Sequence, residues 1–144
     1  MPISLLAKKE DSIDICMLIQ QVKSSLKGNA CGAIATFTGI VRAKGADGAA
    51  VDHLEYEVYE DVARKSLDAM VKAVVLIEGV HEAAICHKYG KFIPGEEVLY
   101  VVIAAERSQV AFDILRLAMA RVKHELPIWK KEATAGGKHW VNVD

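Results

Sequence analysis

The chain has 144 residues, of which 52% are hydrophobic and 26% are charged. This composition is typical of a globular protein that is large enough to bury a core, and a single domain over residues 1–144 is expected. The 18 Lys and Arg residues nearly balance the 19 Asp and Glu residues, for a net charge of −1, so neither nucleic acid nor an anionic membrane is an expected partner. No apolar stretch is long enough to cross a bilayer, and the first residues lack the pattern of a secretory leader, which predicts a cytoplasmic protein.

The first half of the chain alternates between helical and extended patterns. Apolar residues recur at helical spacing over residues 15–26, and either Asp11 or Ser12 is expected to cap this helix. Residues 31–41 are rich in β-branched and apolar side chains, and residues 51–58 alternate apolar with acidic ones. These two segments are predicted strands, joined by a loop rich in Gly and Ala.

Two further helices and two hairpins are predicted in the second half of the chain. An apolar stripe indicates each helix, and Gly or Pro marks the boundaries and the turns. The predicted elements are a helix over residues 60–78 that ends at Gly79, a hairpin of strands 80–87 and 97–105 around Pro94-Gly95, a helix that Ser108 caps and Pro127 ends, and a hairpin of strands 128–133 and 138–143 around Gly136-Gly137. This order predicts an α+β fold in one domain, with a mixed, largely antiparallel sheet packed against about three amphipathic helices.

Familiar catalytic and metal-binding motifs are absent from the sequence. It contains no glycine-rich nucleotide motif, no nucleophile-elbow serine and no zinc-protease helix, and its five histidines lack zinc-ligand spacing, so no metal site is expected. The three cysteines are too widely spaced for a disulfide framework, and buried thiols are favoured over a redox role. Residues 107–144 contain seven basic and four acidic side chains, which suits a solvated surface, the commoner case, or an anion site.

Two lysines flank the predicted junction between the last helix and the strand that follows it. Lys123 falls in the last helical turn and Lys130 lies just beyond Pro127, so both amines can face one cleft. A lysine near another cation, or partly removed from water, has a lowered pKa and can act as nucleophile or proton carrier. Two solvated surface lysines are the alternative.

Arg42 closes an apolar strand, where it can bind an oxyanion or simply end the strand, and Phe37 can belong to the core or stack on a flat ring.

Several short strings in a fixed order give the sequence a family resemblance. They are GAIATFTGIVR at residues 32–42, LEYE at 54–57, HKYG at 87–90 with PGE at 94–96, PIWKKE at 127–132 and WV at 140–141. In this order, over residues 30–141, they resemble the catalytic, large subunit of molybdopterin synthase. The resemblance implies an α/β-hammerhead-like fold and a sulfurtransferase of molybdenum cofactor biosynthesis, which converts cyclic pyranopterin monophosphate into molybdopterin.

The resemblance also implies the sulfur donor, the partners and the site. The donor would be the C-terminal thiocarboxylate of a small ubiquitin-like subunit, no cofactor would be bound, and two large subunits would form a central homodimer within a heterotetramer. Lys123 resembles the main catalytic lysine, and Lys130 resembles the second active-site lysine. The substrate-binding positions that the resemblance implies are Phe37, Ile40, Val41, Arg42, Glu106, Arg107, Lys131 and Glu132.

Two departures from the family pattern support an alternative. Glu106 stands where many members have histidine, and it could pair with Arg107 and weaken the grip of that arginine on phosphate. Many members continue beyond the Trp-Val pair with a tail that carries a further basic residue, whereas here only residues 142–144 follow. The alternative is a catalytically degenerate subunit that binds the ubiquitin-like partner without turnover. A small anion-binding module without chemistry is the third interpretation.

Overall fold

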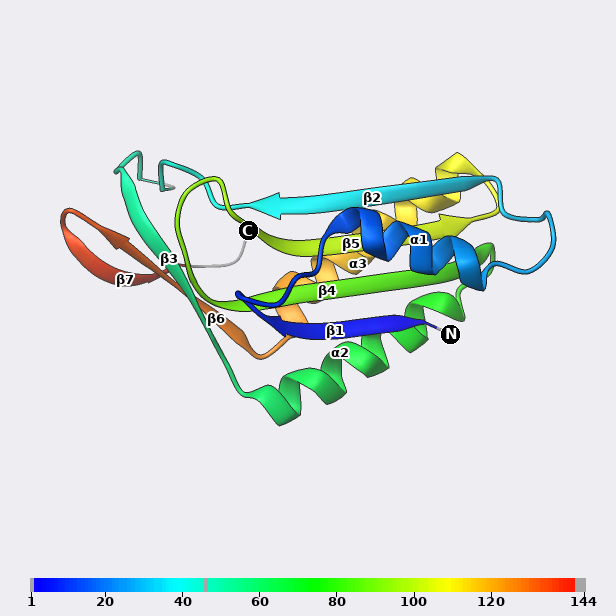
Figure 1. Ribbon diagram of the computed structural model, residues 1–144, viewed down its shortest axis with the longest axis horizontal. Coiled ribbons are helices and arrows are strands. Elements are labelled where there is room, and N and C mark those ends of the chain that lie inside the picture. The colour runs from blue at the N-terminus through cyan, green and yellow to red at the C-terminus, as the bar shows by residue number, and fades with distance from the viewer. Residues whose placement is uncertain (1, 46, 142–144) are drawn as a thin grey trace.

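A seven-stranded sheet with three helices forms the fold in a computed structural model that describes residues 2–45 and 47–141. Strands β2, β5, β4 and β1 lie side by side in one long part of the sheet, and β3, β6 and β7 form an arm at one end of it (Figure 1). The predicted α+β class is confirmed. In chain order the elements are β1 (Ile3–Lys8), α1 (Ile15–Ser25), β2 (Ala33–Ile40), β3 (Val51–Val58), α2 (Glu60–Val75), β4 (Val80–Phe92), β5 (Glu97–Ala105), α3 (Ser108–Glu125), β6 (Ile128–Thr134) and β7 (Gly137–Val141).

Strand β4 connects the long part of the sheet to the arm, because it is long enough to pair with three neighbours. It pairs antiparallel with β5 over residues 80–87 and parallel with β1 over residues 84–89. Its last residues, 90–92, pair with residues 54–56 of β3. The other neighbouring strands in the described chain all pair antiparallel, so the prediction of a mixed, largely antiparallel sheet is confirmed.

The helices pack on both faces of the long part of the sheet. α1 covers one face, and α2 and α3 cover the other (Figure 1). Alternate residues of β5 therefore enter two separate cores: Tyr100 and Val102 face α1, whereas Val101 and Ile103 face α2 and α3. All four side chains are at most 1% exposed, and burying an apolar side chain of this size contributes about 1.5–3 kcal/mol. Burial on both faces explains why β5 is apolar without alternation.

The N-terminus of α1 differs from the sequence prediction. Neither Asp11 nor Ser12 caps the helix; the cap is Asp14, whose Oδ1 accepts a hydrogen bond from the Met17 N–H at 2.9 Å. An N-cap must immediately precede the first helical residue, which Asp14 does. Asp11 instead closes the turn after β1, where its Oδ2 accepts from the Lys8 N–H at 2.9 Å.

Other differences concern one strand and several boundaries. The sequence patterns do not predict β1, since no turn signal precedes this six-residue segment, yet it pairs with β4 along its whole length. β4 continues to Phe92 because its end pairs with β3, and α2 ends at Val75, where the chain tightens into hydrogen bonds to i−3 carbonyls. Ser108 is the first residue of α3, and its N-cap is Arg107. The end of the last predicted strand, residues 142–143, lies outside the described residues.

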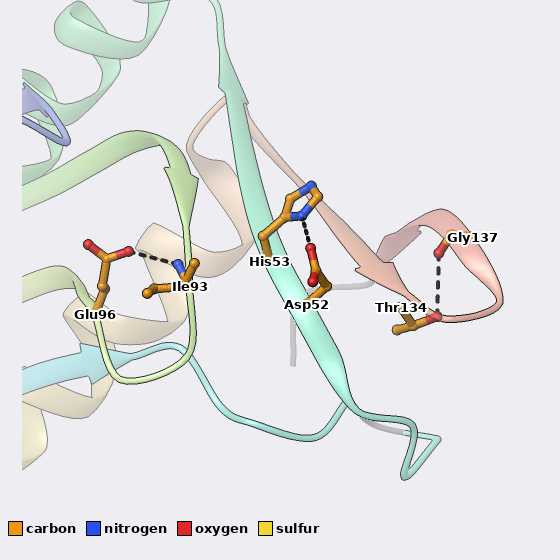
Figure 2. A network of polar contacts seen from close by, with 6 residues as sticks. All are labelled: Asp52, His53, Ile93, Glu96, Thr134 and Gly137. Atoms are coloured by element: carbon orange, nitrogen blue, oxygen red, sulfur yellow. Dashed lines mark hydrogen bonds and ion pairs between the residues drawn. The ribbon is translucent and has the colours of Figure 1, made fainter.

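Both predicted hairpins are present, and side-chain contacts fix their turns (Figure 2). Gly95 in the β4–β5 turn has a φ of 93°, a left-handed conformation that favours glycine. The Glu96 carboxylate accepts from the Ile93 N–H at 2.8 Å, which stabilises the same turn. In the β6–β7 turn the Thr134 hydroxyl donates to the Gly137 carbonyl at 3.4 Å.

Candidate active site

A cavity of about 310 Å³ opens where the arm meets the long part of the sheet, beneath the last turns of α3. Its wall is formed by the ends of β2 and α3, the starts of β5 and β6, and single residues of β3 and β4. This volume lies at the lower end of the range for small-molecule sites. The cavity brings together five of the residues that the sequence singled out, namely Phe37, Ile40, Arg42, Lys123 and Lys130.

The junction between α3 and β6 brings both lysines to this cavity. α3 ends at Glu125 because Pro127 cannot continue the helix, and the chain enters β6 directly afterwards. Lys123 therefore lies in the last helical turn, and Lys130 is the third residue of the strand, where it pairs with Tyr56 of β3. Both lysine side chains are half-buried and line the same cavity, so of the two arrangements that the sequence allows, the structure has the shared cleft.

Arg42 reaches the cavity from the end of β2. The register between β2 and β5 shifts between Gly39 and Ile40, and the strand ends there. The Val41 N–H then donates to the Glu96 carbonyl at 2.9 Å, which holds the outgoing chain against the β4–β5 turn. Arg42 follows as an exposed side chain that lines the cavity. The strand end thus places a guanidinium beside the two lysines.

The charge of the cavity wall is entirely positive. Arg42, Lys123 and Lys130 can only donate hydrogen bonds, and among the described residues that line the cavity none is acidic. A wall of this kind attracts an anion and can stabilise negative charge that develops during a reaction. The ligand class that it fits is therefore a phosphate or a carboxylate derivative.

A smaller cavity of about 50 Å³ adjoins the first and contains a buried carboxylate. Glu132 is 5% exposed, and its Oε1 lies 3.6 Å from Nε2 of His139. Val41, also buried, lines this cavity with Glu132, while Arg42 and Lys130 line both cavities. The structure thus places Val41 and Glu132 beside the cationic wall rather than on it.

Three of the expected site residues line neither of these two cavities. Glu106 and Arg107 follow the far end of β5, and Glu106 lies about 24 Å along the chain from the cavity-lining Leu99 at 3.4 Å per residue. Glu106 Oε1 lies 3.6 Å from Arg107 Nε, which is the pairing that the sequence suggests. Lys131 points from the opposite face of β6 to Lys130. Its Nζ lies 3.3 Å from Glu57 Oε1 and 4.4 Å from the centre of the Trp140 ring.

Two aromatic side chains to which the sequence assigns no role also line the cavity. The Tyr56 ring stands edge-on to the His87 ring, with centroids 5.0 Å apart and planes at 75°. Burial raises the pKa of Tyr56 to about 12 and lowers the pKa of His87 to about 4, so both side chains are uncharged at neutral pH. Their presence in the LEYE and HKYG strings of the resemblance is the one sequence signal that points to them.

Two features of other protein classes are not found in residues 2–45 and 47–141. No group of three or more His, Cys, Asp or Glu side chains there is placed to hold a metal ion. In the same residues, no helix is both long and apolar enough to cross a membrane.

The helices on both faces of the sheet and the cationic cavity at its end define a class of protein, an α+β protein with a cavity whose charge suits an anionic small molecule. The sequence profile of the MoaE protein family matches residues 9–125. The match covers most of the chain, and the chain belongs to this family. The resemblance carried by the short strings is thereby confirmed.

Individual relatives agree with this family. A protein of Haloferax volcanii named probable molybdopterin synthase is 34% identical over 134 residues, which are 92% of this chain and 51% of that protein. The molybdopterin synthase catalytic subunit of Ralstonia nicotianae is 35% identical over 112 residues, which are 78% of this chain and 63% of that protein. This chain therefore spans about half of the first relative and less than two thirds of the second. The solved structure of the molybdopterin biosynthesis MoaE protein from Burkholderia ambifaria matches with a TM-score of 0.77 and 27% identity, over 99% of this chain and 90% of that chain.

Proposed function

We propose that this chain is the catalytic subunit of a molybdopterin synthase, a sulfurtransferase of molybdenum cofactor biosynthesis. The observation that carries this proposal is the convergence of Arg42, Lys123 and Lys130 on one cavity of about 310 Å³. Membership of the MoaE protein family and the names of two relatives support the same activity. The substrate is cyclic pyranopterin monophosphate, and the product is molybdopterin with its two dithiolene sulfurs.

The cations of the cavity suit both reactants. The substrate carries a phosphate ester, which Arg42 and Lys130 bind through charge-assisted hydrogen bonds. The sulfur donor is the C-terminal thiocarboxylate of a small ubiquitin-like subunit, and the same positive charge attracts this anionic tail into the cavity. The donor subunit supplies the sulfur, so the chain binds no cofactor of its own.

Lys123 is the catalytic residue of this reaction. Its amine stabilises the charge that develops as the thiocarboxylate sulfur attacks a carbon of the substrate, and its proton goes to the oxygen that leaves that carbon. Hydrolysis of the resulting thioester then leaves the sulfur on the substrate and releases the tail of the small subunit as a carboxylate. Lys130 positions the phosphate or the acyl intermediate from the neighbouring strand. Phe37 and Ile40 supply an aromatic and an apolar wall for the substrate ring.

The active assembly contains more than this chain. The name catalytic subunit, which the Ralstonia relative bears, fits an enzyme with a second kind of subunit. Two copies of this chain form a central dimer, and each copy binds one small ubiquitin-like subunit, which gives a heterotetramer in the cytoplasm. Residues 1–144 form one domain of that assembly. Glu106 and Arg107, which lie far from the cavity of their own chain, act at the cavity of the second copy.

Molybdopterin formation by purified proteins tests this function. The chain is mixed with a thiocarboxylated small subunit and cyclic pyranopterin monophosphate, and the product is measured as its fluorescent oxidised derivative. We expect product from the wild type and about a hundredfold less from Lys123→Ala, because proton transfer by a positioned side chain contributes at least this factor. Lys65→Ala removes an exposed lysine from α2 and serves as a matched control with wild-type turnover.

The same mixture distinguishes the degenerate subunit from the enzyme. The ion pair between Glu106 and Arg107, at 3.6 Å, favours a protein with weakened phosphate binding. Such a protein would form a stable complex with the small subunit and yield no molybdopterin. If Lys123→Ala formed product at the wild-type rate, the protein would still be an enzyme, but the catalytic role assigned to Lys123 would be wrong.

A further inference from the structure

One ring nitrogen of His87 forms a hydrogen bond to the backbone, and the other does not. The ring lines the candidate active-site cavity from β4. Its Nδ1 lies 2.8 Å from the Lys88 carbonyl oxygen, and because a carbonyl only accepts, Nδ1 carries the proton. Nε2 is then an unprotonated acceptor, and it has no hydrogen-bond partner among the residues that the structure describes.

The surroundings hold this ring in one orientation. Tyr56 packs edge-on against His87 and also against Phe92, whose ring centroid lies 6.1 Å from that of Tyr56 with the planes at 74°. Phe92 is 1% exposed and His87 is 6% exposed, so this group of three rings is anchored in the core. A side chain that is fixed before binding loses little conformational freedom when a ligand arrives.

His87 differs in hydrogen-bonding type from the charged groups around it. Arg42, Lys123 and Lys130 can only donate, whereas Nε2 of His87 in this tautomer can only accept. Nε2 therefore selects a ligand atom that bears a proton. A phosphate ester and a thiocarboxylate present acceptors at neutral pH, so neither of the anionic groups that the cations attract can satisfy Nε2.

We infer that His87 binds the heterocycle of the substrate, accepting at Nε2 a hydrogen bond from a ring N–H or an exocyclic amino group while the cations hold the anionic groups. A reduced pterin carries such donors along its edge. The identity of the heterocycle rests on the proposed function, whereas the placement of the Nε2 acceptor at the cavity rests on the structure alone. The cavity thus recognises two chemically distinct ends of one substrate.

The chemistry of His87 suits an acceptor rather than a general base. Burial lowers the pKa of His87 to about 4, so the ring accepts a hydrogen bond at neutral pH without taking the proton. Loss of this bond weakens substrate binding and leaves the sulfur-transfer step largely intact. We expect a KM that rises about tenfold and a kcat that changes less than about threefold.

Two substitutions separate the Nε2 acceptor from the bond to the backbone. His87→Asn keeps an N–H near the position of Nδ1 and lacks an acceptor at the position of Nε2. His87→Gln places a carbonyl oxygen near Nε2 and gives up the Nδ1 bond. The probe is 6,7-dimethyltetrahydropterin, a reduced pterin without phosphate, titrated calorimetrically into the full chain. We expect His87→Asn to bind it about tenfold more weakly and His87→Gln to stay within about threefold of the wild type, with the affinity for inorganic phosphate unchanged in both.

Several results would overturn this inference. They are a wild type that does not bind the pterin, a His87→Asn variant that binds it as tightly as the wild type, and a His87→Gln variant weaker than His87→Asn, which would assign the effect to the Lys88 bond. His81→Asn changes an exposed histidine at the other end of β4 and is the matched control.

A measurement on the wild type makes the test independent of whether the variants fold. At least one N-methylated derivative of the probe should bind about tenfold more weakly than the parent pterin. Equal binding of every derivative would also overturn the inference. The proposed function is tested separately, since it fails when the wild type forms no molybdopterin.

Discussion

His87 illustrates how burial sets the charge of a single side chain. The ring is enclosed by its own strand, by Tyr56 and by the core, and the loss of hydration disfavours the imidazolium. Its pKa consequently falls from an ordinary value of 6.5 to about 4 in the folded protein. The unfolded chain exposes the same ring to water, so between these two values the unfolded state binds a proton that the native state does not.

We expect this difference to make the folded protein less stable in acid. Because the unfolded state binds the extra proton, the free energy of unfolding decreases as the pH falls from 6.5 toward 4. At pH 4.5 the His87 contribution to this loss is roughly 2–3 kcal/mol. Urea unfolding at pH 7 and pH 4.5 measures it, with His87→Asn as the reference, because asparagine does not titrate. An equal loss of stability in both proteins would contradict this origin.

The residues of the site differ in how far the sequence could predict them. Lys123 and Lys130 sit on either side of Pro127, a strong local signal, so the sequence offers a shared cleft or two solvated surface lysines, and the structure places both side chains at one cavity. The tautomer and burial of His87 depend on a neighbouring carbonyl and on Tyr56 from a different strand. No spacing rule reports a contact of that kind, because the two strands are brought together only by the tertiary fold.

At the scale of elements, the start of α1 depends on one side chain among several candidates. Asp11, Ser12 and Asp14 are all residue types that cap helices. Only Asp14 accepts a hydrogen bond from the Met17 N–H in the first turn. α1 packs through Leu18 and Val22, which are fully buried, so a loosened first turn weakens the core that this helix forms with the sheet.

We expect Asp14→Ala to lower the free energy of unfolding by about 1 kcal/mol, the usual effect of removing an N-cap. Ser12→Ala, two residues earlier and exposed, should change it by less than about 0.5 kcal/mol. Chemical denaturation of the two variants beside the wild type provides the comparison. If Ser12→Ala lowered the free energy of unfolding more than Asp14→Ala, the N-cap would be Ser12, one of the two residues that the sequence analysis proposes.

The elements that the sequence predicts well are those with local signals. Gly and Pro at the turns of both hairpins, and apolar stripes between them, define all three helices and most strands. β1 carries no such signal, and its place beside β4 arises from a parallel pairing between residues about 80 positions apart. The extension of β4 to Phe92 has the same origin, since its partner there is β3.

At the scale of the whole molecule, α3 spans the distance between two groups of charged residues. Arg107 is its N-cap and Lys123 lies in its last turn, which separates their backbones by about 24 Å at 1.5 Å per residue. One chain therefore cannot bring both side chains to one small substrate. In the proposed dimer, a second copy related by a two-fold axis would present its own Arg107 to the cavity, and each of the two cavities would then gain the same residue.

Mixing two inactive variants tests this sharing of residues between copies. Lys123→Ala and Arg107→Ala should each form little molybdopterin with the small subunit present. After subunit exchange, half of the dimers are mixed, and in each of these one cavity has both Lys123 and Arg107, so about one quarter of the wild-type activity should return. The matched control mixes Lys123→Ala with Lys130→Ala; because both lysines line one cavity of the same chain, no activity should return. If the first mixture formed no molybdopterin although native mass spectrometry showed that subunits had exchanged, Arg107 would not take part in the reaction or would not act at the cavity of the second copy.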